Sequence, residues 1–313
     1  MTISLSAPRK IFGALPAFFR IRPGLAVAVT FLALIAVLAA SASLLPHDAY
    51  RQDLLHRNSP PSLKHLFGTD ELGRDMLARL AVGARVSLLV AATSTIAAVL
   101  IGIAVGATAG YKRGWVDSLA MRFVDSMYAF PDTLFAILIA GIVKGQLSNN
   151  STVFLAPIVT LYKLSGGLFG VFLTLSFTSW LVCARLVRAE VTVLRSAEYV
   201  SAARLAGASD MFVMFRHILP NCLPVIIVAA SFVVPSAILL EAGLSFLGIG
   251  VDPPTPSWGT MIASGVRSMQ SYPHLLIMPA FAVGITLLSI NVIGDALREH
   301  FDPSFTGRHG AAS

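Results

Sequence analysis

Long apolar runs separated by short polar stretches dominate this chain of 313 residues. An uncharged run of about 20 residues is long enough to cross a bilayer as an α-helix. The pattern predicts six such helices, at 23–46, 86–111, 121–143, 164–184, 218–247 and 273–294. The predicted fold class is therefore an all-α polytopic membrane protein, in which an even number of spans places both termini on the same side.

The polar stretches between the apolar runs divide the chain into segments that are predicted to lie on one side of the membrane or the other. A basic segment, 1–22, is expected in the cytoplasm and precedes the first span. A signal peptide is the rival interpretation of that span, but the apolar run at 23–46 exceeds the usual apolar region of about 7–15 residues. The later parts are an extracytoplasmic segment with an interfacial helix (47–85), a five-helix core (86–295) containing a cytoplasmic loop (189–221), and a cytoplasmic tail (296–313).

Two stretches interrupt the regular pattern. Pro131 and Asp132 break the third predicted span, and Asp125 is expected to pair with Arg122 one turn earlier. The apolar part of 145–162 is too short to span, so this stretch is predicted to be an external loop with an interfacial or re-entrant piece.

Small residues mark one predicted helix contact. Gly102, Gly106 and Gly110 recur every four residues in the second span. Such a stripe lets the backbone of another membrane helix approach closely. Helix packing, rather than ligand binding, is the predicted role.

Composition agrees with a membrane protein. Hydrophobic residues make up 56% of the chain and charged residues only 12%, against about 25% in soluble domains. The net charge of +7 raises the question of nucleic acid, but the basic residues form no stripe with interleaved aromatics. They lie beside apolar runs, and the predicted cytoplasmic segments hold more of them than the external ones. A lipid bilayer, and no nucleic acid, is therefore expected as a partner.

Motifs for catalysis or cofactor binding are absent from the sequence. It contains no G-x-x-x-x-G-K-[ST] loop for ATP, and no H-E-x-x-H or paired C-x-x-C motif for zinc. Cys183 and Cys222 imply no disulfide framework. Ile293-Gly294-Asp295 matches part of an intramembrane protease motif, but Val292 replaces its first glycine, and Asp295 is expected to pair with Arg298. No enzymatic activity, cofactor or metal is expected for this chain alone.

The stretch 198–221 is a polar island that predicts two short helices. Gly207 suits the left-handed residue that closes the first helix, and Ser209 can cap the second. Small residues give the first helix a face that lets another backbone come close: Ala202, Ala203 and Ala206. Apolar residues share one predicted face of the second: Met211, Phe215, Ile218 and Leu219. A compact helix-turn-helix of this kind suits docking of a partner.

The spacing Ala202-Ala203…Gly207…Leu219-Pro220 resembles the EAA loop of ABC-importer permeases, in particular the dipeptide and oligopeptide branch. Ser201 stands where the usual glutamate is found and His217 where isoleucine is usual. Glu198, one turn earlier, is a candidate for the missing carboxylate. The resemblance implies a coupling helix that contacts an ATPase through Glu198, Ser201, Ala202, Ala203, Gly207, Ala208, Ser209, His217, Leu219 and Pro220.

Two further motifs extend the resemblance over 67–303. FGTDELGRD (67–75) is similar to the segment after the first helix in C-type subunits of peptide and nickel importers, and 240–262 is similar to the peptide-permease branch. Arg74, Asp75 and Glu241 are candidate pathway or structural residues. A solvated ion-pair surface is the plainer interpretation of Arg74 and Asp75, and the sequence identifies no partner for Glu241.

The resemblance implies a non-catalytic permease subunit of the bacterial inner membrane. Its implied partners are a homologous second permease, two ABC ATPases that bind ATP and Mg²⁺, and an extracytoplasmic solute-binding protein. Its implied cargo is a dipeptide or oligopeptide, with nickel and glutathione as related alternatives, moved by alternating access. A stand-alone secondary transporter or channel is the rival class, and predicts intramembrane charges and inverted repeats that the sequence does not clearly show.

Overall fold

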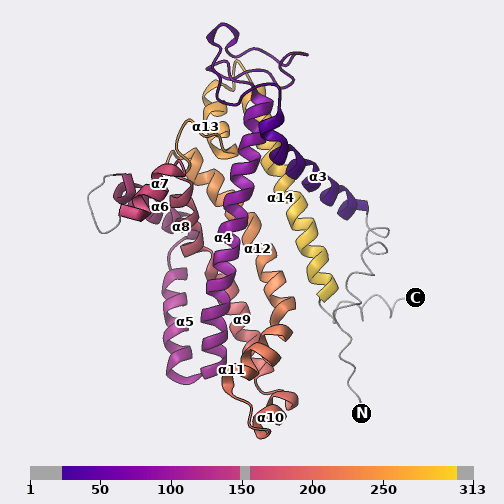
Figure 1. The fold of residues 1–313 in the computed structure, drawn as a ribbon, viewed down its shortest axis with the longest axis vertical. Helices are drawn as coiled ribbons and strands as arrows, with labels where there is room; N and C mark the ends of the chain where they lie inside the picture. Colours follow the sequence, from indigo (N-terminus) through magenta and orange to yellow (C-terminus); the bar gives the residue numbers. More distant parts are fainter. Residues whose placement is uncertain (1–22, 149–155, 302–313) are drawn as a thin grey trace.

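The computed structural model describes residues 23–148 and 156–301. The predicted cytoplasmic segment 1–22 and most of the predicted tail lie outside these ranges. The described residues form helices and connecting loops without a β-sheet, as predicted (Figure 1). In chain order the elements are α3 (Pro23–Ala40), η1 (Ser41–Leu44), η2 (Leu54–His56), α4 (Met76–Lys112), α5 (Gly114–Tyr128), α6 (Asp132–Ser148), α7 (Ala156–Leu164), α8 (Leu168–Thr178), α9 (Trp180–Leu194), α10 (Glu198–Leu205), α11 (Asp210–Val213), η4 (Met214–Ile218), α12 (Leu219–Phe246), α13 (Trp258–Ser268) and α14 (His274–Phe301).

Within residues 23–148 and 156–301, five stretches are long and apolar enough to cross a membrane: Pro23–Leu44, Met76–Lys112, Leu168–Leu194, Asp210–Phe246 and His274–His300. A sixth arises only if α5 and α6 are counted together, because the chain bends by 91° between them. The bend falls at Pro131, which has no N–H to donate and disfavours helix at the residue before it. The third predicted span is therefore a broken pair of helices and not one continuous helix.

Several predicted boundaries differ from the structure. The fourth predicted span, 164–184, corresponds to Leu168–Leu194 and so ends ten residues later, at the end of α9. The interfacial helix expected before Val86 is the start of α4, which runs unbroken from Met76. The fifth span also begins earlier than predicted, because α11 continues through the π-helical turn η4 into α12. Pro220 lies in the first turn of α12, where the missing backbone N–H of proline removes no hydrogen bond within α12. Finally, α6 extends to Ser148 through residues predicted to be a loop. The rest of that predicted loop, 149–155, lies outside the described residues.

The glycine stripe of α4 packs closely against α9, as predicted. A Cβ atom added to Gly102 would lie 2.6 Å from the Cβ of Cys183, and one on Gly110 would lie 2.7 Å from the carbonyl oxygen of Arg188. Between them, a Cβ on Gly106 would collide with the carbonyl oxygen of Ala184. The axes of α4 and α9 can approach this closely only because glycine lacks a side chain.

Ion pairs connect α9 with α5. Asp125 pairs with Arg185 at 2.5 Å, so its predicted pairing with Arg122 is wrong. The prediction considered only neighbours on the same helix, whereas the packing of α9 against α5 brings Arg185 to the Asp125 carboxylate. Arg188 pairs in the same way with Asp117. The expected pair between Asp295 and Arg298 is present, at 4.0 Å, and both cysteines are free and buried.

Candidate functional site

The helices α10 and α11 form a knob at one end of the molecule, opposite the polar segment 45–75 (Figure 1). Gly207 has φ +83° and follows α10, as predicted. The N–H groups of Gly207 and Ala208 donate to the carbonyl oxygens of Arg204 and Ala203, each at 3.0 Å, which is the Schellman arrangement. Ser209 accepts from Phe212 N–H and so caps α11. The sequence therefore specifies the knob through its own turn chemistry. We call residues 198–218 the end knob.

Buried side chains hold the end knob firmly against the helix bundle. Val200, Val213 and Ile218 are fully buried in one hydrophobic cluster with residues of α4, α9 and α12. The hydroxyl of Tyr111, at the end of α4, donates to the Asp210 carboxylate. The Arg204 guanidinium lies 5.1 Å from the centre of the Tyr111 ring. A force applied to the knob is consequently passed to α4 through both packing and polar contacts.

Large apolar side chains of the end knob are exposed, and together we call them its outer face. Leu205 is 90% exposed, and Met211, Phe212 and Phe215 are between 53% and 66% exposed. Exposed apolar side chains with polar neighbours mark sites that bind another protein or the membrane. The outer face of the end knob is therefore the candidate docking surface.

The residues of the EAA-like spacing divide between two faces. Glu198, Ser201, Ala202, Gly207, Ser209 and Pro220 are exposed, whereas Ala203, Ala208, His217 and Leu219 are partly buried. Ala203 packs towards the bundle, so the three alanines do not form one outward face. The predicted apolar face of α11 is also divided, because Met211 points to solvent and Ile218 is buried. Sequence spacing located the knob but not which side chains face outwards.

At the opposite end, the polar segment contains an ordered charge network. Arg74 Nε donates to Asp70 Oδ2 at 2.7 Å, and Arg79 Nε lies 3.3 Å from the same oxygen. The side chains of Arg74 and Asp70 are only 12% and 9% exposed. The predicted solvated surface is therefore wrong for Arg74. Asp70 also accepts the backbone N–H groups of Leu72 and Arg74, which folds the loop back over the pair.

Asp75 is a buried cap of α4. One of its carboxylate oxygens accepts the N–H of Ala78, and the other accepts a hydrogen bond from His65 Nδ1, both at 2.9 Å. The sequence indicated Asp75 as a candidate pathway or structural residue, but it indicated neither His65 nor the nearby His47. No short motif links these three residues, so only the fold of the loop reveals their proximity.

Glu241 is completely buried and has the partners that the sequence did not reveal. Its two carboxylate oxygens accept the hydroxyls of Ser87, on α4, and Ser245, one turn further along α12, each at 2.8 Å. The Ser87 hydroxyl in turn lies 3.4 Å from the Trp258 N–H, at the start of α13. Glu241 therefore joins three helices through a small hydrogen-bonded network, which is a structural arrangement.

Replacing Glu241 with leucine is expected to lower the free energy of unfolding by about 1–3 kcal/mol, because two buried hydroxyls lose their acceptor. Glu241→Gln keeps one acceptor oxygen and is expected to cost less. Thermal unfolding of the purified protein measures both. If Glu241 instead lined the transport pathway, Glu241→Gln would leave the unfolding free energy unchanged and sharply reduce transport.

Comparisons with known proteins agree with the helical architecture. Residues 98–307 match the family described as "Binding-protein-dependent transport system inner membrane component". The chain is 38% identical over 257 residues to the oligopeptide transport system permease protein OppC of Bacillus subtilis, covering 82% of this chain and 77% of the relative. It is 42% identical over 249 residues to a putative peptide transport system permease protein of Brucella suis, covering 79% and 76%. A chain of the MetNI methionine ABC transporter, solved in inward-facing conformations, has a similar fold, with a TM-score of 0.55, 16% identity, and coverage of 72% of this chain and 98% of that one.

Proposed function

The chain belongs to the family of binding-protein-dependent transport system inner membrane components and is a multi-pass permease subunit of an ABC importer, and we propose that its cargo is a dipeptide or oligopeptide. The cargo proposal is supported by the similarity to OppC and to permeases named for peptide transport, over most of both chains. Nickel and glutathione are the related alternatives that the family resemblance implies. The fold similarity to MetNI supports the permease architecture and carries no argument about cargo.

The proposed motor attachment is the end knob. Its exposed apolar surface, on two short helices that are anchored to α4, is the single observation that carries the proposal. The partner is an ABC ATPase subunit, which binds ATP and Mg²⁺ itself, whereas this chain binds no cofactor. Exposed small residues beside the apolar group, Ala202 and Ala206, let the backbone of the partner come close to α10.

The arrangement of the two ends gives the proposed topology. The end knob lies in the cytoplasm, and the polar segment 45–75 lies outside, where an extracytoplasmic solute-binding protein delivers cargo. A homologous second permease completes the pathway as a heterodimer with this chain. Large apolar side chains along α4, including Leu89, Ile96 and Leu100, are more than half exposed and are available to lipid or to that second subunit.

The proposed mechanism is alternating access driven by the ATPases. ATP can shift the transporter between two states only if it binds one state more tightly than the other. ATP binding draws the two ATPases together, and each end knob transmits this displacement to its bundle through Val200, Val213 and the contact between Tyr111 and Asp210. Rigid attachment is required here, because a loosely tethered knob would move without the helices.

Reconstitution tests the proposed function. Proteoliposomes that contain this chain, its second permease and both ATPases are expected to take up a labelled dipeptide when the binding protein and ATP are supplied. Vesicles with this chain alone are the control and are expected to be inactive. Uptake of Ni²⁺ or glutathione instead of peptide overturns the cargo proposal, and ATP-independent uptake by this chain alone favours the secondary-transporter class.

A further inference from the structure

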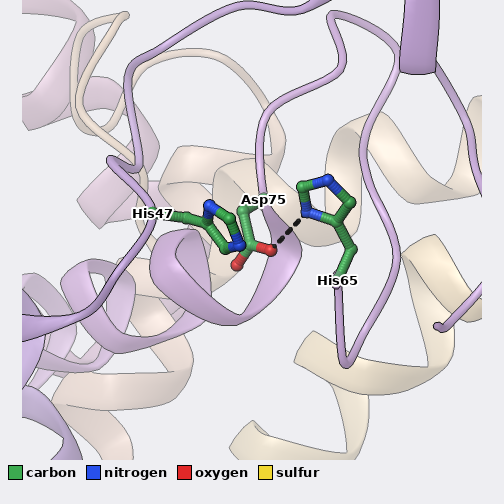
Figure 2. A group of neighbouring side chains, drawn as sticks. All are labelled: His47, His65 and Asp75. Carbon is green, nitrogen blue, oxygen red and sulfur yellow. Dashed lines mark hydrogen bonds and ion pairs between the residues drawn. The ribbon is translucent and has the colours of Figure 1, made fainter. Parts of the chain in front are cut away.

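Two histidines and an aspartate converge at the end of the molecule opposite the end knob. His47 lies just after η1, His65 lies in the following loop, and Asp75 caps α4 (Figure 2). One potential ligand atom from each residue lies within 4.8 Å of those of the other two. The imidazole rings are 4.8 Å apart between centres, and their side chains point towards the same carboxylate (Figure 2). Segments far apart in sequence thus bring three metal-ligating groups to one point.

Hydrogen bonds hold each of the three side chains in place. His65 Nδ1 lies 2.9 Å from Asp75 Oδ2, while the other oxygen of Asp75 is fixed by the N–H of Ala78. His47 Nε2 lies 2.8 Å from the carbonyl oxygen of Lys64. The His65 and Asp75 side chains are only 14% and 6% exposed. When an ion binds, bonds to the metal replace the hydrogen bond between His65 Nδ1 and Asp75 Oδ2, and the remaining imidazole proton of His65 lies on Nε2. His47 donates to Lys64 through Nε2, which leaves its Nδ1 lone pair for the ion. The contacts to Ala78 and Lys64 are kept, so these side chains lose little conformational entropy on binding.

A polar cavity of about 290 Å³ gives access to the group. His47, His65 and Asp75 all line it. Two further carboxylates, Asp48 and Asp53, and two cations, Arg51 and Lys64, share the lining. The carboxylates offset the repulsion that the cations exert on an incoming metal ion, so the cavity presents no strong barrier of positive charge.

The donor set selects the class of ion. Two imidazole nitrogens and one carboxylate oxygen match the three protein ligands of open zinc sites, which keep a further position for water. Zn²⁺, Ni²⁺ and Cu²⁺ suit imidazole, whereas Mg²⁺ and Ca²⁺ prefer oxygen ligands throughout. Bonds of about 2.0–2.1 Å around a tetrahedral ion place donors roughly 3.4 Å apart. The longest distance between ligand atoms, at most 4.8 Å, therefore shortens by up to about 1.4 Å, and the 2.9 Å between His65 and Asp75 lengthens by about 0.5 Å.

We propose that His47, His65 and Asp75 bind a divalent transition-metal ion, with Zn²⁺ as the representative ligand. The bound ion ties the segment after η1, the following loop and the first turn of α4 together. Binding stabilises this polar segment, because an ion that binds only the folded arrangement shifts the folding equilibrium. The proposal concerns a resident ion in this chain and is independent of the cargo that the transporter carries.

Zinc titration of the full-length chain tests the proposal. The chain is purified through an affinity tag that contains no histidine, so that the tag itself does not bind Zn²⁺. Isothermal titration calorimetry is expected to show one Zn²⁺ bound per chain with little competition from Mg²⁺. Co²⁺ is expected to give the visible absorption of a site with nitrogen and oxygen ligands, which a purely structural hydrogen-bond cluster does not produce. His47→Asn and His65→Asn are each expected to weaken Zn²⁺ binding at least about tenfold.

His56→Asn is the matched control. His56 also pairs with an aspartate, Asp53, at 2.8 Å, and lies in the same segment, but it is half exposed and belongs to no three-ligand group in the described part of the chain. The hydrogen bond from His56 lowers the pKa of the Asp53 carboxyl. This variant is expected to bind Zn²⁺ like the wild type.

Asp75→Asn separates the loss of a metal ligand from a loss of folding. Asparagine caps helices as well as aspartate does, so the variant keeps the cap of α4 and removes the carboxylate. This variant is expected to keep its thermal stability without metal and to lose affinity for Zn²⁺. Wild-type chain that binds no Zn²⁺, or His47→Asn, His65→Asn and Asp75→Asn variants that all bind it normally, overturns the proposal. Equal weakening by His56→Asn also overturns it, since the ion would then be bound by surface histidines in general.

Discussion

Replacing Leu205 and Phe212 together with aspartate abolishes ATP-driven uptake while leaving the subunit folded. The two side chains are 90% and 53% exposed. The edge-to-face contact of Phe212 with the His217 ring, 5.7 Å between centres, is an internal contact that the double substitution removes. Central side chains of an interface contribute about 2 kcal/mol or more each, and two buried, unpaired carboxylates add a desolvation cost. Affinity for the ATPases is expected to fall by about 100-fold or more, as measured by co-purification and by uptake into proteoliposomes.

Leu55→Asp is the control for this pair. Leu55 is 93% exposed in η2, within the polar segment 45–75 at the opposite end of the molecule (Figure 1). The substitution therefore repeats one of the two changes from an exposed apolar side chain to a carboxylate without touching the end knob. Co-purification of the ATPases is expected to be unchanged in this variant. Normal recovery of the ATPases with the Leu205 and Phe212 double variant would show that they bind elsewhere.

A side chain at Gly106 separates α4 from α9 and is expected to lower the free energy of unfolding by about 3 kcal/mol or more. Over-packing of a core costs about 1–3 kcal/mol where side chains can rearrange. Here the obstacle is the backbone carbonyl of Ala184, which cannot rotate away, and the ion pairs of α9 with Asp117 and Asp125 oppose its displacement. Gly106→Leu is therefore expected to give little monodisperse protein in detergent, and Gly106→Ala an intermediate yield.

Gly243→Ala and Gly243→Leu are the matched controls. Gly243 also lies within a long membrane helix, α12, but no atom outside its own helix lies within 4 Å of the position that a Cβ would occupy. These substitutions are expected not to lower the unfolding free energy of the isolated subunit, because alanine and leucine favour a helix over glycine by up to about 1 kcal/mol. Equal losses at Gly106 and Gly243 would mean that glycine flexibility, and not close approach of α9, is what matters.

Features specified by neighbouring residues could be predicted from the sequence. Gly207 closes α10 and Ser209 caps α11 because each acts on the backbone within a few residues. The spacing of Gly102, Gly106 and Gly110 likewise predicted a close contact, although not that α9 supplies it. The positions of the membrane spans followed from the apolar runs, but their ends did not, since the second, fourth and fifth differ by about eight to ten residues at one end. The third predicted span is a pair of helices because Pro131 breaks it.

Contacts between residues that lie far apart in the sequence could not be predicted in this way. Glu241 meets Ser87 across 154 positions of sequence, and Asp125 meets Arg185 across 60. His47, His65 and Asp75 come together only because the loop before α4 folds back on itself. Local spacing also failed to separate Ala202, which is exposed, from Ala203, which packs inwards, since neighbouring helical residues point about 100° apart.

The most direct test of the importer account attaches a photoactivatable crosslinker to a cysteine at position 205. Cys183 and Cys222 are fully buried, so Leu205→Cys is expected to be the main reactive thiol in the described part of the chain. The account predicts a crosslink from this position to the ATPase in the assembled complex, and labelling only by reagents that reach the cytoplasmic side. Labelling of this cysteine from outside intact cells, with no crosslink to the ATPase, would contradict it.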